Sequence, residues 1–331
     1  MRQGEAFIGD LASGSEFRRI LSRERKKVPA EDEPPFGWQR TKDIDGNDLE
    51  AALTARDGEA EAVVIERALD AFTDHFASVL LRFLVTDSWK GTRRIVCGGG
   101  LMEGELGAEL LRRADERMRR HHPDLEMRRL HHPPDVAGMV GWAYAAPRDA
   151  LAQGDGFVAV DIGGTNVRWG IVRIDRTPAE RDRLTVAHHE KWCHADEDVD
   201  REHMVGRIAD GVGSMRALAA ADGIRLAPFV GLSCPGVIRP EGRLESGGQN
   251  LPGDWSESGF DLPHEVAARL EPIEAREPLV MLHNDAVIQA LSDVPRMRDV
   301  ERWAAVTLGT GLGNCSFRNV PGDLKSGVAD A

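Results

Sequence analysis

The chain has 331 residues and a formal net charge of -13, so it is long enough for two lobes with cores of their own. Its acidic balance argues against a nucleic-acid partner, which requires a basic face, and no apolar run approaches the length that spans a bilayer. The cysteines, Cys97, Cys193, Cys234 and Cys315, have no paired spacing. We therefore expect reduced thiols and a cytoplasmic protein without a membrane partner.

The first part of the chain predicts helices around a charged loop. Ala12-Ser13-Gly14 precedes a helical pattern, and residues 22–62 are charged, with a turn signal before a helix that starts near Asn47 or Asp48. Residues 63–84 carry apolar side chains at nearly helical spacing. We expect residues 22–62 to be largely a solvated surface segment.

The next stretch predicts a strand that runs into three glycines. Residues 94–97 lead into Gly98, Gly99 and Gly100, and an amphipathic helix follows. Residues 125–130 predict a strand, and residues 135–146 a buried helix rich in small side chains. The pairs at 121–122 and 131–132 are adjacent histidines without supporting carboxylate or cysteine spacing, so we expect them at the surface rather than on a metal.

A glycine-rich hairpin is predicted in the middle of the chain. Apolar strands at 157–160 and 168–172 flank the segment Asp161-Ile-Gly163-Gly164-Thr165-Asn166. The glycines allow the backbone to approach an anion, and Thr165 and Asn166 offer polar groups. A carboxylate such as Asp161 suits Mg²⁺, which commonly binds through one or two carboxylates plus substrate phosphates. Taken alone, the segment also fits an ordinary hairpin.

Two further strands end in polar residues. Residues 280–282 lead into Asn284-Asp285 and then a helix. A carboxylate at a strand end suits a general base, whereas either residue could instead cap the helix. Residues 305–308 lead into Gly309-Thr310-Gly311, a second turn that can hold phosphate. Neither turn matches a P-loop or a Rossmann fingerprint.

Together these segments resemble the ROK family (repressors, open reading frames, kinases) and bacterial glucokinases of the actin/hexokinase/Hsp70 superfamily. Asp161 to Arg168 is similar to the family's first phosphate motif, and residues 309–313 to its second. Asn284-Asp285 is similar to its catalytic Asn-Asp pair, and the segment around Asn250 to its sugar-contacting segment. The resemblance implies a two-lobed, ribonuclease H-like α/β fold with mixed sheets and flanking helices.

The resemblance also implies ATP-dependent phosphorylation of a hexose or amino-hexose hydroxyl. Asp285 would be the general base, Asn250, Asn284 and Asp285 would contact the sugar, and Asp161 would hold Mg²⁺ through water. It assigns the nucleotide to Asp161, Gly163, Gly164, Thr165, Asn166, Arg168, Gly309, Thr310, Gly311, Gly98, Gly99 and Gly100. The family's zinc motif of one histidine and three cysteines is not found in the sequence, so no zinc is expected. Trp255 fits either a sugar contact or packing.

The order of the segments differs from that of the family. Residues 1–146 resemble the family's C-terminal, adenosine-side lobe, and residues 157–331 its N-terminal lobe. A circular permutation, with residues 147–156 as an exposed linker between the former termini, explains this order. Two half-kinases that complete each other in a homodimer are the alternative.

One part of the family's sugar site is missing. The family supplies a Glu-x-Gly-His stretch after the second phosphate motif and a further Glu before the Ser-Gly pair, whereas residues 314–331 contain neither Glu nor His. Asp10 and Glu5 are the nearest substitutes. We therefore expect either a weak, broad kinase or, as the alternative, a non-catalytic sugar- or nucleotide-binding regulatory protein. A donor other than ATP, such as polyphosphate, stays open.

Overall fold

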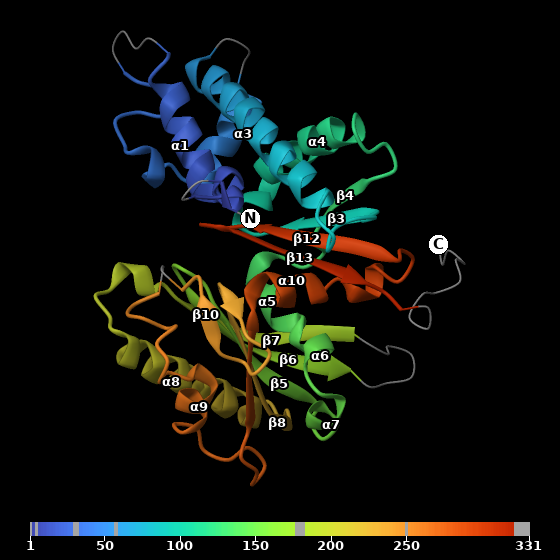
Figure 1. Cartoon of the computed structure of the whole chain (residues 1–331). Coiled ribbons are helices and arrows are strands. Elements are labelled where there is room, and N and C mark those ends of the chain that lie inside the picture. Colours follow the sequence, from blue (N-terminus) through green and yellow to red (C-terminus); the bar gives the residue numbers. More distant parts are fainter. Residues whose placement is uncertain are drawn as a thin grey trace. The chain divides into compact units, whose positions relative to one another are not determined.

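The computed structural model describes residues 2–3, 6–28, 33–55, 59–175, 183–248 and 251–320. The chain forms two compact units (Figure 1). Unit 1 comprises Met1–Leu130 and Arg296–Ala331, and unit 2 comprises His131–Pro295. In the described part of the chain, no helix is both long and apolar enough to cross a bilayer.

Unit 1 has a four-stranded sheet in the order β13-β12-β3-β4. Its strands are β3 (Arg94–Gly98), β4 (Glu126–Arg129), β12 (Arg302–Leu308) and β13 (Leu312–Arg318). Strand β12 is antiparallel to β13 and parallel to β3, which is parallel to β4. The helices of unit 1 are α1 (Gly14–Arg25), α2 (Gly46–Thr54), α3 (Ala60–Leu84) and α4 (Gly104–Arg119). A short hairpin of β1 (Arg2–Gln3) and β2 (Ala6–Phe7) and the 3-10 turn η1 (Ile8–Ala12) precede them.

Local side-chain hydrogen bonds set where the first helices begin. The Ser13 hydroxyl accepts a hydrogen bond from the Glu16 amide (3.1 Å), and the Asp45 carboxylate accepts one from the Asp48 amide (2.8 Å). Each bond satisfies an amide that has no partner within its helix. The two predicted helix starts, after Ala12 and near Asn47, are thus confirmed.

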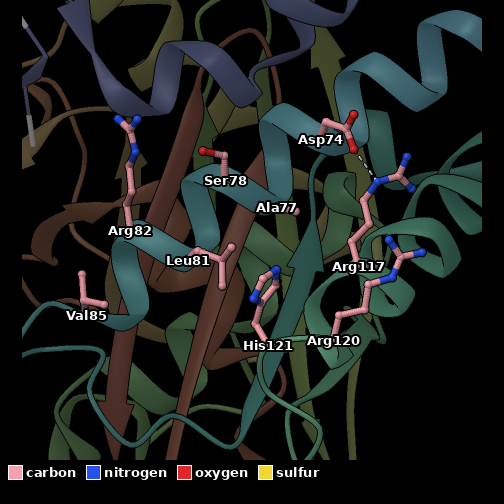
Figure 2. Close-up of a pocket in the computed structure, with 9 residues that line it drawn as sticks. All are labelled: Asp74, Ala77, Ser78, Leu81, Arg82, Val85, Arg117, Arg120 and His121. Atoms are coloured by element: carbon pink, nitrogen blue, oxygen red, sulfur yellow. Dashed lines mark hydrogen bonds and ion pairs between the residues drawn. The ribbon is translucent and has the colours of Figure 1, made fainter.

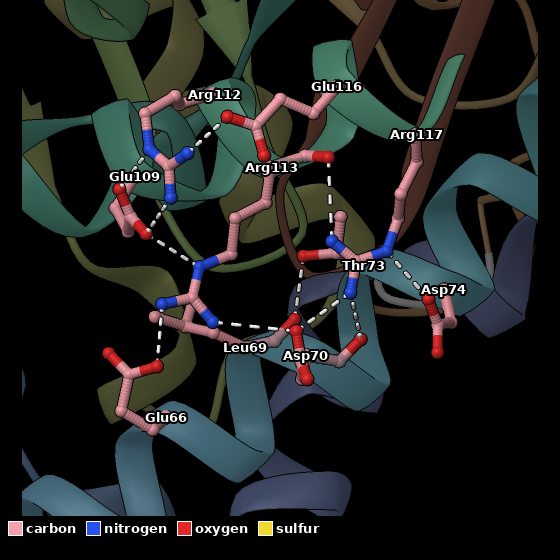
Figure 3. A network of polar contacts seen from close by, with 10 residues as sticks. All are labelled: Glu66, Leu69, Asp70, Thr73, Asp74, Glu109, Arg112, Arg113, Glu116 and Arg117. Carbon is pink, nitrogen blue, oxygen red and sulfur yellow. Dashed lines mark hydrogen bonds and ion pairs between the residues drawn. The ribbon is translucent and has the colours of Figure 1, made fainter. Parts of the chain in front are cut away.

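Helix α3 forms the centre of the unit 1 core and is also tied to α4 by charge. Phe72 of α3 packs edge-to-face on Phe17 of α1, with ring centroids 5.5 Å apart. On the opposite side, Arg113 of α4 reaches Glu66 of α3 (2.7 Å), and Arg117 reaches Asp70 and Asp74 (Figure 3). Such exposed pairs stabilise little individually, so the apolar contacts hold the helices together and the network fixes their alignment.

Unit 2 has a five-stranded sheet in the order β11-β8-β5-β6-β7. Its strands are β5 (Gly156–Ile162), β6 (Val167–Asp175), β7 (Arg183–Trp192), β8 (Leu226–Cys234) and β11 (Leu279–Asn284). Strands β5, β8 and β11 are parallel, and β6 is antiparallel to both of its neighbours. A two-stranded ribbon of β9 (Val237–Ile238) and β10 (Leu244–Ser246) follows β8.

Helices cover both faces of this sheet. They are α5 (Pro134–Val140), α6 (Trp142–Ala145), α7 (Arg148–Leu151) and α10 (Asp285–Leu291) on one face, and α8 (Arg201–Ala221) and α9 (Leu262–Ala267) on the other (Figure 1). Strand β5 serves both cores by alternation. Val158 and Val160 pack with α8, whereas Phe157 and Ala159 pack with Trp142 of α6.

The two sheets share one arrangement of four strands. In each sheet, one strand pairs with an antiparallel hairpin partner on one side and with the first of two parallel strands on the other. In unit 2, β5 lies between its hairpin partner β6 and the parallel strands β8 and β11. In unit 1, β12 lies between its hairpin partner β13 and the parallel strands β3 and β4. This confirms the predicted ribonuclease H-like architecture. The hairpin comes first in the chain in unit 2 and last in unit 1.

The observed units differ from the predicted division at 146 and 157. Residues 302–318 belong to unit 1 because β12 pairs with β3, and α5 and α6 belong to unit 2 because they pack on its sheet. Within the predicted linker 147–156, exposed and buried residues occur together. Leu151 is buried in the core, and a Cβ at Gly154 would lie 2.2 Å from the Ala227 amide nitrogen.

Candidate functional site

A row of polar residues crosses the sheet of unit 2 near the carboxyl ends of its parallel strands. The strand register aligns Lys191 with Arg168, Arg168 with Asp161, Asp161 with Ser233, and Ser233 with His283. Aligned residues of neighbouring strands project from the same face of a sheet. All five strands therefore contribute a polar side chain to the face that α5 and α10 cover.

Asp161 is the most unusual member of this row. It is only 4% exposed, and its Oδ1 atom has no hydrogen-bond partner among the described residues. Its Oδ2 atom lies 3.5 Å from Arg168 Nη1. Burial raises the pKa of Asp161 to about 7; Arg168 lowers it, and the charges of Asp285 and Asp135 raise it further. A buried carboxylate with an unused oxygen is suited to a cationic ligand.

Helix α5 covers this carboxylate, and its close packing explains why two of its positions, Gly138 and Gly141, are glycine. A Cβ at Gly138 would lie 2.8 Å from the Asp161 Cγ atom, and one at Gly141 would lie 1.7 Å from the Ile288 carbonyl oxygen. Only glycine permits these approaches to β5 and α10. Asp135, at the start of α5, holds Arg168 at 2.5 Å, so it competes with Asp161 for the same guanidinium.

The first glycine turn is held by the segment that follows β7. The Gly163 amide donates to the Asn166 carbonyl (2.8 Å) and closes the turn. His194 is buried and donates from Nε2 to the Gly163 carbonyl (2.9 Å), while the Ala195 amide donates to Thr165 (3.3 Å). His194 could not be predicted from the sequence, because 31 residues separate it from the turn.

The structure separates the roles of Asn284 and Asp285. Asn284 is the N-cap of α10: its Oδ1 accepts from the Val287 amide (3.1 Å), and its Nδ2 donates to the Gly236 carbonyl (2.7 Å). Asp285 opens the helix and is partly exposed. Burial raises the pKa of Asp285 to about 6, while hydrogen bonds from the Ala286 amide (2.8 Å) and its own amide lower it.

His283 stands directly before this pair and was not predicted as a site residue. Its Nδ1 accepts a hydrogen bond from the Asn284 amide (2.8 Å), and burial lowers its pKa. The ring is therefore neutral near pH 7, with its proton on Nε2. A histidine in an apolar strand gave no separate signal in the sequence.

In unit 1, the second glycine turn meets the start of α1. The Gly14 amide donates to the Gly309 carbonyl (2.8 Å), and the Ser15 hydroxyl donates to the Thr310 carbonyl (2.9 Å). A Cβ at Gly14 would lie 2.5 Å from the Gly309 oxygen, so only glycine fits there. These contacts join residues 295 positions apart in the sequence.

A cavity of about 520 Å³ opens beside this turn, and its lining combines several predicted nucleotide residues. Gly309, Thr310 and Gly100 line it, together with the first residues of α1, α2 and α4. Helix N-termini carry partial positive charge, so three of them favour an anion at this place. Glu50 moderates this field, because its carboxylate accepts from the Glu105 amide (2.9 Å) at the start of α4.

The surroundings of the glycine triplet, residues 98–100, differ at each position. A Cβ at Gly98 would lie 2.1 Å from Leu130, and Gly99 has φ +87° and would collide with the backbone of Leu308. Gly100 has open space around its Cα, as do Gly309 and Gly311. Open space at these three positions leaves room for a ligand beside the backbone.

For the remaining predicted site residues the structure shows less. Asn250 and Glu5 lie outside the described residues, and Asp10 is exposed in η1. Trp255 is buried against Phe260 and donates to the Pro252 carbonyl (2.6 Å), so packing explains it. In the described ranges, no group of three or more His, Cys, Asp or Glu side chains is placed to hold a metal. Another cavity of unit 1, about 500 Å³ between the ends of α3 and α4, contains no predicted site residue (Figure 2).

Comparison with known proteins gives similarity only at the level of structure. No family model matches the chain, and no curated protein matches it in sequence. A ROK family glucokinase from Streptomyces griseus, solved with glucose and AMPPNP, is 21% identical over 48% of this chain and 43% of that chain, with a TM-score of 0.32. An inorganic polyphosphate/ATP-glucomannokinase from Arthrobacter sp. strain KM is 20% identical over 50% and 61%, with a TM-score of 0.33.

A glucokinase from Balamuthia mandrillaris, solved with glucose, is 20% identical over 57% of this chain and 50% of that chain, with a TM-score of 0.33. The alignments thus span about half the length of these structures. The solved structures that this chain resembles include ROK family sugar kinases, the family that its sequence motifs indicate.

Proposed function

We propose that this chain transfers the terminal phosphoryl group of ATP to a hydroxyl of a hexose or amino-hexose, with Asp285 as the general base. The observation that carries the proposal is the state of Asp285. It opens α10 directly after the edge strand β11 and is partly exposed, and burial raises its pKa to about 6. A carboxylate of this kind is mostly ionised at pH 7 yet basic enough to take a proton.

The geometry around Asp285 supports this role. One oxygen is oriented by the Ala286 amide (2.8 Å), and the neighbouring Asn284 fixes the first turn of the helix. The other oxygen would accept the hydroxyl proton as the O–H bond breaks and the new O–P bond forms, while the bond between the γ-phosphorus and its bridging oxygen breaks and ADP leaves. Positioning of this kind, together with neutralisation of phosphate charge, supplies most of the catalysis in phosphoryl transfer.

The cavity of unit 1 is our proposed nucleotide site. Gly309, Thr310, Gly311 and Gly100 would present backbone to the phosphates, and the starts of α1, α2 and α4 favour negative charge there. Gly98 and Gly99 shape the backbone beside it. In unit 2, Gly163, Gly164, Thr165, Asn166 and Arg168 form the second proposed phosphate-binding segment.

Asp161 fits a hydrated magnesium ion. It offers a buried oxygen without a partner, beside a glycine turn, and a carboxylate is the ligand Mg²⁺ uses with substrate phosphates. We propose that Asp161 holds Mg²⁺ through water. The ion, when bound, would neutralise phosphate charge.

The sugar assignment rests on the resemblance of the sequence motifs. We propose Asn250 and Asn284 as sugar contacts, with Asp10 and Glu5 as partial substitutes for the family's missing glutamates. Asn284 already uses its oxygen and one amide hydrogen within the chain, so only its second amide hydrogen is free for a sugar. We therefore propose that fewer groups hold the sugar than in the family, and we expect weak, broad binding.

The test measures ADP release with a panel of hexoses and amino-hexoses, using ATP and then polyphosphate as donor. Asp285→Asn should lower turnover by roughly two to four decades while sugar binding, measured by calorimetry, is retained. Asp261→Asn is the matched control, since Asp261 also begins a helix of unit 2 and accepts from the His264 amide. Near-normal turnover of Asp285→Asn would refute the assignment of the base, and no ADP with any sugar would refute the kinase.

A further inference from the structure

Unit 1 presents a tryptophan to solvent on a rigid loop. Trp38 is 81% exposed, the highest exposure among the large apolar side chains in the described ranges. The residues on either side of it, Gly37 and Gln39, are hydrogen-bonded to Arg25. These bonds hold the backbone that carries the exposed ring. The loop, residues 34–41, lies between α1 and α2 in the chain and plays no part in the proposed kinase chemistry.

Arg25, the last residue of α1, fixes the backbone of this loop through hydrogen bonds. Its guanidinium donates to the carbonyls of Pro35 (3.0 Å), Gly37 (2.8 Å) and Gln39 (3.1 Å), and to the Thr41 hydroxyl (2.8 Å). A guanidinium offers five donors in a planar fork, and four of these bonds here converge on one short loop. The loop is thereby held on both sides of Trp38.

Phe36 adds a second restraint that carries strain. It has φ +62°, the left-handed region that a bulky residue rarely adopts, at the third position of a turn closed by the Gly37 amide and the Pro34 carbonyl (2.8 Å). Its side chain is buried, and its amide donates to the Glu61 carboxylate (3.2 Å). Strain of this kind persists where the surroundings over-determine a conformation, and it is concentrated at functional places.

An acidic groove lies next to the loop. Its volume is about 410 Å³, and its apolar lining includes Ala51 and Ala52 of α2 and Ala55, which directly follows the helix. Gly37 and Gln39, the neighbours of Trp38 in the chain, also line it. Asp48, Glu59 and Glu61 supply its charge. Among the described residues around the groove, the cation Arg40 is paired with Asp43 (2.6 Å) and Arg25 is committed to the loop, so the charged side chains of the described lining are acidic.

We propose that Trp38 and this acidic groove form a docking surface for a partner protein that presents a basic segment with arginine or lysine side chains. Charge complementarity selects the partner's sign, because carboxylates on the groove attract cations and repel acidic segments. The exposed indole adds a preference for arginine and lysine, because tryptophan forms the strongest cation–π interactions of the aromatic side chains. A fixed tryptophan beside a groove is also the residue type that most often dominates binding at an interface.

The experiment titrates the full chain with the peptide (Arg-Ala)4 and follows binding by calorimetry. Trp38→Ala should weaken binding at least tenfold, and Asp48→Asn with Glu59→Gln should do the same. The matched controls are Val85→Ala, another exposed apolar residue of unit 1, and Asp87→Asn with Asp124→Asn, two exposed acids of unit 1. These should bind like the wild type, and (Glu-Ala)4 should not bind.

Three outcomes would overturn the proposal. Equal binding by Trp38→Ala removes the indole from the surface. An equal loss in the Asp87 and Asp124 control shows that the overall negative charge of the protein attracts the peptide without a site. A dimer in solution that Trp38→Ala dissociates, seen by sedimentation, assigns the surface to a second copy of this chain instead.

Discussion

Replacing Asp161 by asparagine should make the protein more stable above neutral pH. Asp161 is buried, one of its oxygens has no partner among the described residues, and its nearest cation, Arg168, is held more closely by Asp135 (2.5 Å) than by Asp161 (3.5 Å). Keeping this group ionised inside the protein costs free energy of folding. Asparagine has nearly the same shape and no charge, so it removes that cost.

The size of the effect follows from the pKa. Burial raises the pKa of Asp161 from 3.8 to about 7, so the folded state binds this proton more tightly than the unfolded state. The stability that this protonation provides is fully present below pH 3.8 and is lost as pH rises through about 7. At about 1.4 kcal/mol per pKa unit, Asp161→Asn should exceed the wild type by roughly 4 kcal/mol at pH 8 and by roughly 1 kcal/mol at pH 4.5.

The assay is urea unfolding followed by circular dichroism, in metal-free buffer with EDTA, at both pH values. Asp155→Asn is the control, because Asp155 is a half-exposed acid of unit 2 in a surface pair with Arg225 and should change stability by less than about 0.5 kcal/mol. If Asp161→Asn is no more stable than the wild type at pH 8, or if its advantage does not grow with pH, the buried charge does not have the cost argued here.

Three further predictions concern the site and the chain order. Turnover should fall about tenfold per pH unit below pH 6, because burial raises the pKa of Asp285 to about 6 and protonation removes the base; a profile that is flat down to pH 4.5 would contradict this. Gly311→Val should abolish nucleotide binding in calorimetry by filling open space beside the turn, whereas Gly259→Val, in equally open space in unit 2, should not. If the chain is circularly permuted, as we propose, Gly/Ser inserted between Ala152 and Gln153, which are exposed, should leave melting unchanged within a few degrees, whereas Leu151→Ala in the core should cost about 2–5 kcal/mol.

The sequence alone was sufficient for features that depend on neighbouring residues. Strands run into both glycine turns where the apolar runs predicted them, and Ser13 and Asp45 cap their helices with bonds to amides three residues away. These signals are local, since a turn or cap is formed by residues close in the chain. The motifs themselves also indicated the fold class.

Other features were decided by contacts between distant segments. Asn284 and Asp285 were equivalent in the sequence, and the Gly236 carbonyl, 48 residues away, helps to fix Asn284 as the cap and leaves Asp285 at the helix start. Trp255 fitted two roles until Phe260 and the Pro252 carbonyl enclosed it.

The boundaries of the two units also depend on contacts between segments that are distant in the sequence. The predicted division followed chain order, but strand pairing places residues 302–318 in the sheet of β3. Helix α5 packs on the other sheet, where Gly138 and Asp135 lie close to Asp161 and its partner Arg168. A hydrogen-bonded strand partner or a close helix crossing can lie anywhere in the sequence. Burial and ion pairing at Asp161 arise from such partners, so its pKa belongs to the tertiary structure and not to its motif.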